Sequence, residues 1–204
     1  MQDAVPKIKG QVLTELATQQ PPVAEPALVA RAVIEPIAFA ELYDHYFPLV
    51  HKYVLYRVRD AQMADDLTSQ IFERLLDDLG RYRAERAPFG AWLFGIARHV
   101  ISDHFRVQKR HRWLSLDGLH QLVSPEPPPE AAALQSELSD RLLAAVGRLP
   151  DRERDLIGLK FAAGLNNRQI AALTGLKESH VGVIFYRAMQ HLRTELSDKE
   201  TSDE

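Results

Sequence analysis

The sequence predicts an all-α protein, built as two small helical domains joined by a proline-rich linker, with a helix-turn-helix in the second domain. Three observations lead to this fold class. Apolar residues recur at intervals of three and four, not two, which is the period of helices. Glycine is sparse, at 10 of 204 residues, and runs of β-branched residues are short. Four prolines crowd residues 125–129, where they forbid helix and leave an extended chain facing water.

The first domain is expected over residues 37–112, after an extension over residues 1–36 that we expect to be disordered or only weakly ordered because it contains five prolines. One apolar stripe predicts a first helix over residues 37–57, and a second stripe predicts another over residues 61–79. The charged segment 80–87 is expected to be a loop. Pro88 then suits the first turn of a third helix, which continues to about His111.

Residues 113–133 are the predicted linker, and the second domain is expected over residues 134–196. Its first helix is stopped by Pro150. Asp151 is expected to cap the next helix, and Gly164 to end it. The remaining residues, 197–204, form an acidic tail.

A helix-turn-helix is predicted near the end of the second domain. Asn166 followed by Gln169 is typical of a capping box that starts a short helix. Gly175 lies where the chain must turn sharply, and glycine adopts a positive φ without a Cβ penalty. Val181, Ile184, Phe185 and Ala188 then recur at helical spacing, so a second helix with a buried side is expected. Such a unit can place one helix in a DNA major groove, although an ordinary helical hairpin has the same pattern.

Composition excludes several classes of protein. The chain has no cysteine, so disulfides and thiolate zinc sites are excluded. No apolar run approaches the ~18 residues that span a bilayer, and the N-terminus lacks a signal pattern, so a cytoplasmic protein without membrane insertion is expected. The net charge of −3 at first argues against DNA binding. This average over the whole chain is misleading, because basic residues collect in the segment 98–112 and a local basic stripe is what attracts phosphates.

Three segments, in this order, resemble the bacterial RNA polymerase sigma factors of the extracytoplasmic-function type. Residues 64–75 look like the polymerase-binding helix of that family, and residues 89–106 look like its promoter-melting helix. The segment that starts at Leu149 is similar to its C-terminal promoter-binding domain. The resemblance implies a sigma factor that binds core RNA polymerase, reads the minus-ten and minus-thirty-five promoter elements and promotes DNA opening. It implies neither an active site nor a cofactor.

The resemblance also implies which residues meet which partner. The resemblance implies that core RNA polymerase is contacted at its β′ clamp and β flap. On this chain, one set of residues on the second helix is expected to take part: Asp65, Asp66, Gln70, Phe72, Arg74 and Leu75. Within this set, Phe72 and Leu75 are expected in the core or an interface more than in direct contact with a ligand. The minus-ten element, held as a single strand, is expected to meet a second set, in which cations hold phosphates and aromatic faces accept unstacked bases: Tyr82, Arg83, Phe89, Arg98, His99, Arg106, Lys109 and Arg110. An anti-sigma factor is a further implied partner.

Binding of the minus-thirty-five element is expected from a third set of residues, which belongs to the helix-turn-helix: Arg168, Lys177, Ser179, His180, Gly182, Val183, Tyr186 and Arg187. Here the chain departs from the family, whose members often carry polar or basic residues where this chain has Gly182 and Val183. A glycine lets the helix backbone approach DNA closely, and a valine side chain suits a thymine methyl. The departure puts the target sequence in doubt more than the binding itself.

Parts of the sequence also fit two other functions. A stand-alone DNA-binding regulator would use only the C-terminal helices. A metal-dependent enzyme would use His99, Asp103 and His104, since residues at i and i+4 share a helix face. The sequence lacks a second cluster that would supply a further ligand, and Asp103 is expected to pair with a neighbouring arginine instead. No metal site and no enzyme activity are therefore expected.

Overall fold

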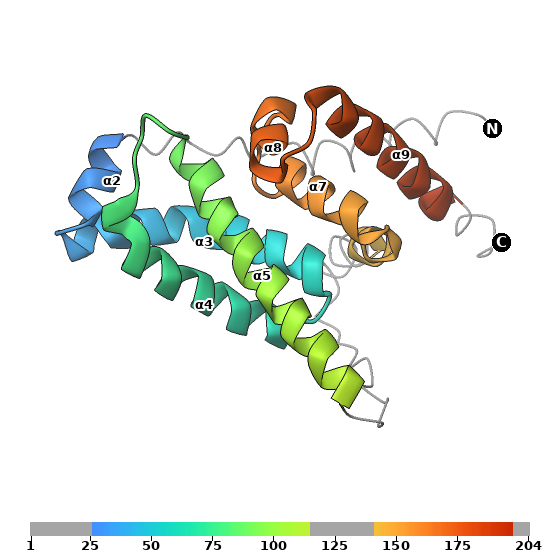
Figure 1. The fold of residues 1–204 in the computed structure, drawn as a ribbon, viewed down its shortest axis with the longest axis horizontal. Coiled ribbons are helices and arrows are strands. Elements are labelled where there is room, and N and C mark those ends of the chain that lie inside the picture. Colours follow the sequence, from blue (N-terminus) through green and yellow to red (C-terminus); the bar gives the residue numbers. More distant parts are fainter. Residues whose placement is uncertain (1–25, 115–140, 198–204) are drawn as a thin grey trace, which may run out of the picture. The chain divides into compact units, whose positions relative to one another are not determined.

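The computed structural model describes residues 26–114 and 141–197 and divides the chain into two compact units. Every regular element in these two ranges is helical, which confirms the predicted fold class. We call the described part of one unit, residues 26–114, the N-terminal unit, and that of the other, residues 141–197, the C-terminal unit (Figure 1). None of the described helices is both long enough and apolar enough to span a bilayer.

The N-terminal unit consists of α2 (Pro26–Ala32), α3 (Pro36–Val58), α4 (Ala61–Asp78), the short 3₁₀ helix η1 (Leu79–Arg81) and α5 (Phe89–Leu114). Helices α3, α4 and α5 pack against one another, and α2 packs on α3 (Figure 1). The core between them contains large side chains that are almost completely buried: Leu42, Tyr46, Tyr53, Leu67, Ile71, Leu75, Leu93, Phe94 and Ile101.

The prediction of a mostly disordered extension over residues 1–36 is wrong for residues 26–36. Pro26 begins α2 and Pro36 lies at the start of α3, because proline is tolerated in the first turn of a helix, where its missing N–H has no partner to lose. Val29 and Ala32 of α2 are buried against the rest of the unit. Residues 1–25 lie outside the described residues. At the other end, α5 continues to Leu114, into the predicted linker, most of which also lies outside the described residues.

A two-residue turn joins α3 to α4 and fixes where the second helix begins. Arg59 adopts a left-handed conformation with φ of 62°, and its N–H donates to the carbonyl oxygen of Leu55 at 2.9 Å. Asp60 follows as the N-cap of α4, and its carboxylate accepts a hydrogen bond from the backbone N–H of Met63 at 2.7 Å. So short a turn returns α4 along α3, as in other helical hairpins.

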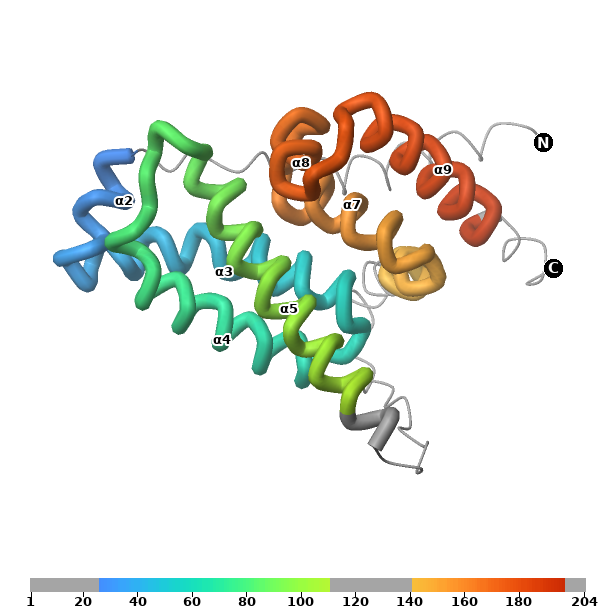
Figure 2. The backbone as a smooth tube through the Cα atoms, in the orientation of Figure 1, coloured from blue at the N-terminus to red at the C-terminus, as the bar shows by residue number. Residues whose placement is uncertain are grey.

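The C-terminal unit consists of a helical segment described over residues 141–148, α7 (Asp151–Phe161), α8 (Asn167–Thr174) and α9 (Glu178–Ser197). Helix α9 packs against both α7 and α8 (Figure 2). The core of the C-terminal unit includes Ala145, Val146, Leu156, Ile157 and Leu159, with Val181 and Ala188 from α9. The start of the first predicted helix and the tail beyond Ser197 lie outside the described residues.

The prediction that Asp151 caps α7 is wrong by one position. Pro150 is the N-cap, and its carbonyl oxygen accepts from the N–H of Arg154 at 3.0 Å, so Asp151 is already the first helical residue. Its carboxylate instead pairs with the guanidinium of Arg154, whose side chain is 9% exposed and whose Nη1 also donates to the carbonyl oxygen of Gly147 at 3.2 Å. Arg154 thus ties the start of α7 to the preceding helix.

The capping box predicted for α8 is present. The side chain of Asn166 accepts from the N–H of Gln169 at 2.9 Å, and the side chain of Gln169 accepts from the N–H of Asn166 at 2.8 Å. Both bonds join residues three apart, so they depend on local sequence alone. This is why the helix start was predictable.

We expect Asn166→Ala to lower the free energy of unfolding of the C-terminal unit by about 1 kcal/mol, because one N–H of the first turn loses its acceptor. Chemical denaturation followed by circular dichroism measures the change. Asn166→Asp keeps the acceptor oxygen and is the matched control, which we expect to retain most of the stability. Equal losses in the two variants would show that the cap contributes nothing.

Candidate polymerase-binding and nucleic-acid surfaces

The exposed side of α4 carries four of the six side chains expected to bind polymerase. Asp65, Asp66, Gln70 and Arg74 are all exposed. The two acids lie in the second turn of the helix, and the helix start is occupied by Asp60 instead. The macrodipole therefore favours Asp60 more than Asp65 or Asp66, since its effect falls off beyond the first turn.

Asp65 is held by a residue that sequence analysis did not single out. Its Oδ1 lies 2.9 Å from Nε2 of His51 on α3, and the Asp65 side chain is 70% exposed. The ring of His51 stacks on that of Phe47, with centroids 5.8 Å apart. His51 and Asp65 are fourteen residues apart, so only the packing of α3 on α4 brings them together.

Two residues of the expected polymerase-binding set, Phe72 and Leu75, face inward, which agrees with the expected place in the core and corrects their place among the exposed contacts. Phe72 is 5% exposed and Leu75 is 1% exposed, because both lie on the side of α4 that packs on its neighbours. The Phe72 ring lies 4.6 Å from that of Tyr43 and 6.1 Å from that of Phe47, both on α3. These buried side chains pack α4 against its neighbours and so support the exposed side of the helix.

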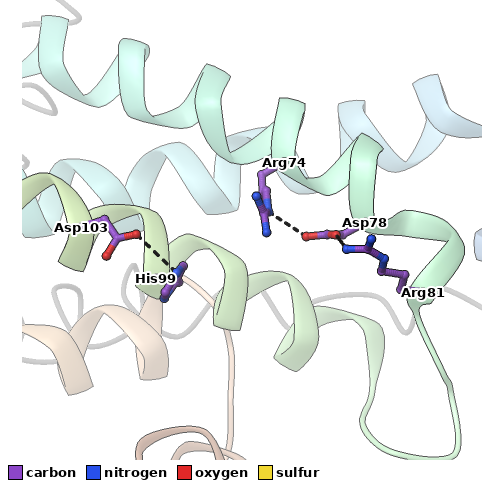
Figure 3. A network of polar contacts seen from close by, with 5 residues as sticks. All are labelled: Arg74, Asp78, Arg81, His99 and Asp103. Atoms are coloured by element: carbon purple, nitrogen blue, oxygen red, sulfur yellow. Dashed lines mark hydrogen bonds and ion pairs between the residues drawn. The ribbon is translucent and has the colours of Figure 1, made fainter.

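Arg74 belongs to a network of polar contacts at the end of α4. Its Nε lies 2.8 Å from one oxygen of Asp78, and Nη1 of Arg81 lies 2.7 Å from the other (Figure 3). The Asp78 side chain is only 15% exposed, whereas those of Arg74 and Arg81 are 58% and 79% exposed. One half-buried carboxylate therefore orients two outward-facing guanidinium groups, a role that sequence analysis did not assign to Asp78.

The loop between α4 and α5 is closed by hydrogen bonds to its own backbone. The Tyr82 hydroxyl donates to the carbonyl oxygen of Ala87 at 3.0 Å. Nη1 of Arg83 donates to the carbonyl oxygens of Gly80 and Tyr82 at 3.1 and 2.9 Å. Burial, together with the nearby charge of Glu85, raises the pKa of Tyr82. Arg83 thus shapes the loop, in addition to presenting a charge at the surface.

Phe89, expected to line a pocket for an unstacked base, is instead part of the core. It is 3% exposed, and its ring lies 5.2 Å from Tyr46, 5.4 Å from Tyr82 and 5.8 Å from Trp92. This prediction is wrong, because the first turn of α5 rotates Phe89 toward α3. Tyr82 and Trp92 are only partly buried, so they are the accessible edge of this aromatic cluster.

The accessible face of α5 carries the cations expected to meet DNA. His99, Arg106, Lys109 and Arg110 are exposed, and Arg98 is half-buried. Asp103 lies among them. Its carboxylate is 3.3 Å from Nε2 of His99 (Figure 3), and it is 2.9 Å from Nη2 of Arg106. The expected pairing of Asp103 with a neighbouring arginine is therefore confirmed. Within the described ranges, no three His, Asp or Glu side chains gather as ligands for a metal ion.

In the C-terminal unit, α8, Gly175 and α9 form the predicted helix-turn-helix. Gly175 ends α8 with φ of 72°, in the left-handed region that glycine adopts readily. Val181, Ile184 and Ala188 are buried as predicted, whereas Phe185 is only half-buried, with Nζ of Lys160 5.8 Å from its ring centre. The residues expected to meet DNA are exposed, apart from Gly182, which is half-buried: Arg168, Lys177, Ser179, His180, Val183, Tyr186 and Arg187.

Two long-range polar contacts join α9 to the rest of the C-terminal unit. Nδ1 of His191 lies 2.7 Å from a carboxylate oxygen of Glu153 on α7, and Arg148 pairs with Glu195. Glu153 is 9% exposed, so its carboxylate is largely shielded from water. Sequence analysis missed both pairs because the partners are 38 and 47 residues apart along the chain. They add polar contacts to the apolar packing of Val181, Ile184, Ala188 and Leu192, which buries one side of α9.

Comparison with known proteins shows the family to which the chain belongs. It matches the family Sigma-70 region 2 over residues 42–111 and the family Sigma-70, region 4 over residues 139–192. It is 35% identical over 172 residues to the ECF RNA polymerase sigma factor BldN of Streptomyces coelicolor. The aligned region covers 84% of this chain and 65% of BldN. It is also 31% identical over 175 residues to the ECF RNA polymerase sigma factor SigD of Mycobacterium tuberculosis, and this aligned region covers 83% of this chain and 82% of SigD.

Solved structures share the fold. CnrH, solved in complex with the cytosolic domain of CnrY, matches with a TM-score of 0.61 at 22% sequence identity. The superposed region covers 84% of this chain and 96% of the CnrH chain. The sigma factor RpoE of Bartonella quintana, solved in complex with the anti-sigma factor NepR, matches with a TM-score of 0.66 at 18% identity and covers 78% of this chain and 96% of its own.

Two helical units in this order, one ending in a cationic helix and one in a helix-turn-helix, define a DNA-binding protein of transcription initiation. The chain belongs to the ECF RNA polymerase sigma factors, a class of promoter-recognising proteins. The alternative of a stand-alone regulator is not favoured, because the region 2 unit accounts for a large part of the chain.

Proposed function

We propose that this chain is the promoter-specificity subunit of a cytoplasmic RNA polymerase and that its two units have separate tasks. In this proposal the exposed side of α4 docks on the β′ clamp of core polymerase through Asp65, Asp66, Gln70 and Arg74. The cationic face of α5 and the loop at Tyr82 hold the opened strand of the minus-ten element. The C-terminal unit places α9 in the major groove of the minus-thirty-five element and meets the β flap.

The observation that carries the proposal is the pairing of regions 2 and 4 on two separate compact units. Two weak DNA contacts joined by a linker act as one strong contact, because the second binding event becomes effectively intramolecular. Phosphate contacts by Arg106, Lys109, Lys177 and Arg187 would supply affinity without sequence preference.

The charges of α5 fit a strand held by its phosphates. Asp103 neutralises part of the positive charge of Arg106 and lies beside His99, whereas Lys109 and Arg110 are exposed one turn further along. Cations at the end of the helix would then engage phosphates most strongly, and the partly exposed rings of Tyr82 and Trp92 are available to unstacked bases.

Reconstitution with core polymerase tests the proposal. We expect the purified chain to co-elute with core RNA polymerase in gel filtration and to direct transcription from a limited set of start sites, mapped by sequencing the 5′ ends of the transcripts. Core polymerase alone is the control. Binding to promoter duplex without polymerase, together with no co-elution and no promoter-dependent transcript, would favour the stand-alone regulator.

An anti-sigma factor is part of the same proposal. CnrH and RpoE of Bartonella quintana were each solved with a bound partner, which is a named anti-sigma factor in the case of RpoE. We expect this chain to be held inactive by a protein that covers its polymerase-binding surface on α4.

A further inference from the structure

The outward face of α9 lacks the side chains that most often recognise base pairs in the major groove. Its first turns place Ser179, Gly182, Val183 and Tyr186 on one stripe, at the spacing of three and four that aligns side chains on a helix. Val183 is 47% exposed and Tyr186 is 67% exposed, among the largest exposures of apolar or aromatic side chains in the described residues. The opposite side of the helix, with Val181 and Ile184, is buried.

The side chains that make paired hydrogen bonds to bases are absent from this stretch. Arginine and lysine read guanine, and asparagine and glutamine read adenine, each through two hydrogen bonds in the major groove. The sequence from Glu178 to Tyr186 contains none of these four residue types. The N-terminal part of a recognition helix is the part that contacts base edges. On this face that part offers the single hydroxyl of Ser179, a valine, a tyrosine ring and the bare backbone of Gly182.

Gly182 leaves an open place in the middle of this face. Apart from its chain neighbours and the adjacent backbone of α9, a Cβ built on Gly182 would meet no atom of the described residues within 4 Å, so packing among those residues does not require glycine there. Glycine inside a helix is destabilising relative to alanine. The position therefore weakens the helix without serving its own fold, which points to a partner that approaches the backbone.

Cations at the edges of the face indicate what that partner is. Lys177 precedes α9, Arg187 lies one residue beyond Tyr186, and Arg168 lies on α8, and all three are exposed. An apolar centre with cations at its borders complements a major groove, in which thymine methyl groups lie between two rows of phosphates.

We propose that α9 recognises thymine through its C5-methyl groups, with Val183 and Tyr186 in van der Waals contact with them and Gly182 admitting the helix backbone close to the base edges. The proposal rests on the proposed function and adds the chemistry by which the C-terminal unit selects its site. Specificity then comes from methyl groups and not from paired hydrogen bonds to guanine or adenine.

Deoxyuridine provides the test, because it differs from thymidine in DNA by the missing methyl group alone. Promoter duplexes are first selected from a random library with the full chain bound to core polymerase. Each thymine of the upstream selected element is then replaced by uracil. We expect about fourfold weaker binding at each contacted position, the effect of losing roughly one buried methyl group, and no change when uracil lies outside the selected elements.

Protein variants connect the effect to α9. With Val183→Ala, we expect the difference between thymine and uracil to shrink at one position of the element, while Val33→Ala, which changes a valine of similar exposure (49%) outside the binding surfaces, leaves it unchanged. Gly182→Ala is expected to raise the thermal midpoint of the C-terminal unit and to weaken promoter binding. If Gly182→Ala raises the thermal midpoint while it weakens promoter binding, the weaker binding cannot come from misfolding and must come from a lost contact with DNA.

The outcomes distinguish this inference from the function on which it rests. Selected binding that is indifferent to uracil at every position, or an upstream element made only of G·C pairs, would overturn methyl recognition and leave the sigma-factor function intact. Failure to select any duplex in the presence of polymerase would overturn both.

Discussion

Charge reversal at Asp65 and Asp66, each replaced by lysine, is expected to weaken binding to core RNA polymerase by roughly 30-fold or more. Both carboxylates are exposed on α4. Replacing them removes two favourable charge contacts and places like charges opposite the basic partner that the proposal requires, which costs a few kcal/mol. Fluorescence anisotropy of labelled protein, titrated with core polymerase, measures the change.

The fold is expected to survive this double substitution. The only ion pair at these two residues in the described structure joins Asp65 to His51, and the Asp65 side chain is 70% exposed. An ion pair this exposed contributes at most about 1 kcal/mol to stability. The far-ultraviolet circular dichroism and the unfolding midpoint should therefore change little.

The matched control is a double reversal on α3, Glu41→Lys with Asp44→Lys. These acids are also exposed and belong to the same unit, but they lie outside the proposed docking surface. We expect their reversal to change polymerase affinity several-fold less. Equal losses in the two double variants would indicate a general effect of net charge and contradict docking through α4.

Phe94→Ala is expected to lower the free energy of unfolding of the N-terminal unit by about 3–5 kcal/mol. Phe94 is completely buried in α5, and its ring meets that of Tyr53 edge-on, with centroids 5.5 Å apart. The truncation removes this contact and leaves a cavity. Since whole domains are stable by only about 5–15 kcal/mol, most of the stability of this unit would be lost.

Tryptophan fluorescence measures this loss selectively, because both tryptophans of the chain, Trp92 and Trp113, belong to α5. The helix-turn-helix belongs to a separate compact unit, so its circular-dichroism transition should remain. Leu76→Ala, at a side chain that is 57% exposed, is the control and is expected to cost under about 0.5 kcal/mol. A loss below 1 kcal/mol for Phe94→Ala would contradict its place in the core.

The elements that sequence analysis predicted well depend on local signals. The Asn166–Gln169 capping box and the turn at Gly175 involve residues close together in the chain, and the structure contains both. The helix α2 was missed because prolines were interpreted as a sign of disorder. A helix of seven residues is too short to be stable alone, so its existence depends on packing Val29 and Ala32 against α3.

For the candidate surfaces, the sequence alone determined which residue types lie on which helix, and therefore the exposed acids of α4, the cations of α5 and the open face of α9. The apolar stripes also predicted a buried side, as for Val181, Ile184 and Ala188 of α9. Only the tertiary structure decided how deeply each remaining side chain is buried and which distant residues meet. Phe72, Leu75 and Phe89 turned inward, and Asp65 met His51 while Glu153 met His191. The physical reason is that helix periodicity is a property of neighbouring residues, whereas the rotation of a helix about its axis is set by what packs against it.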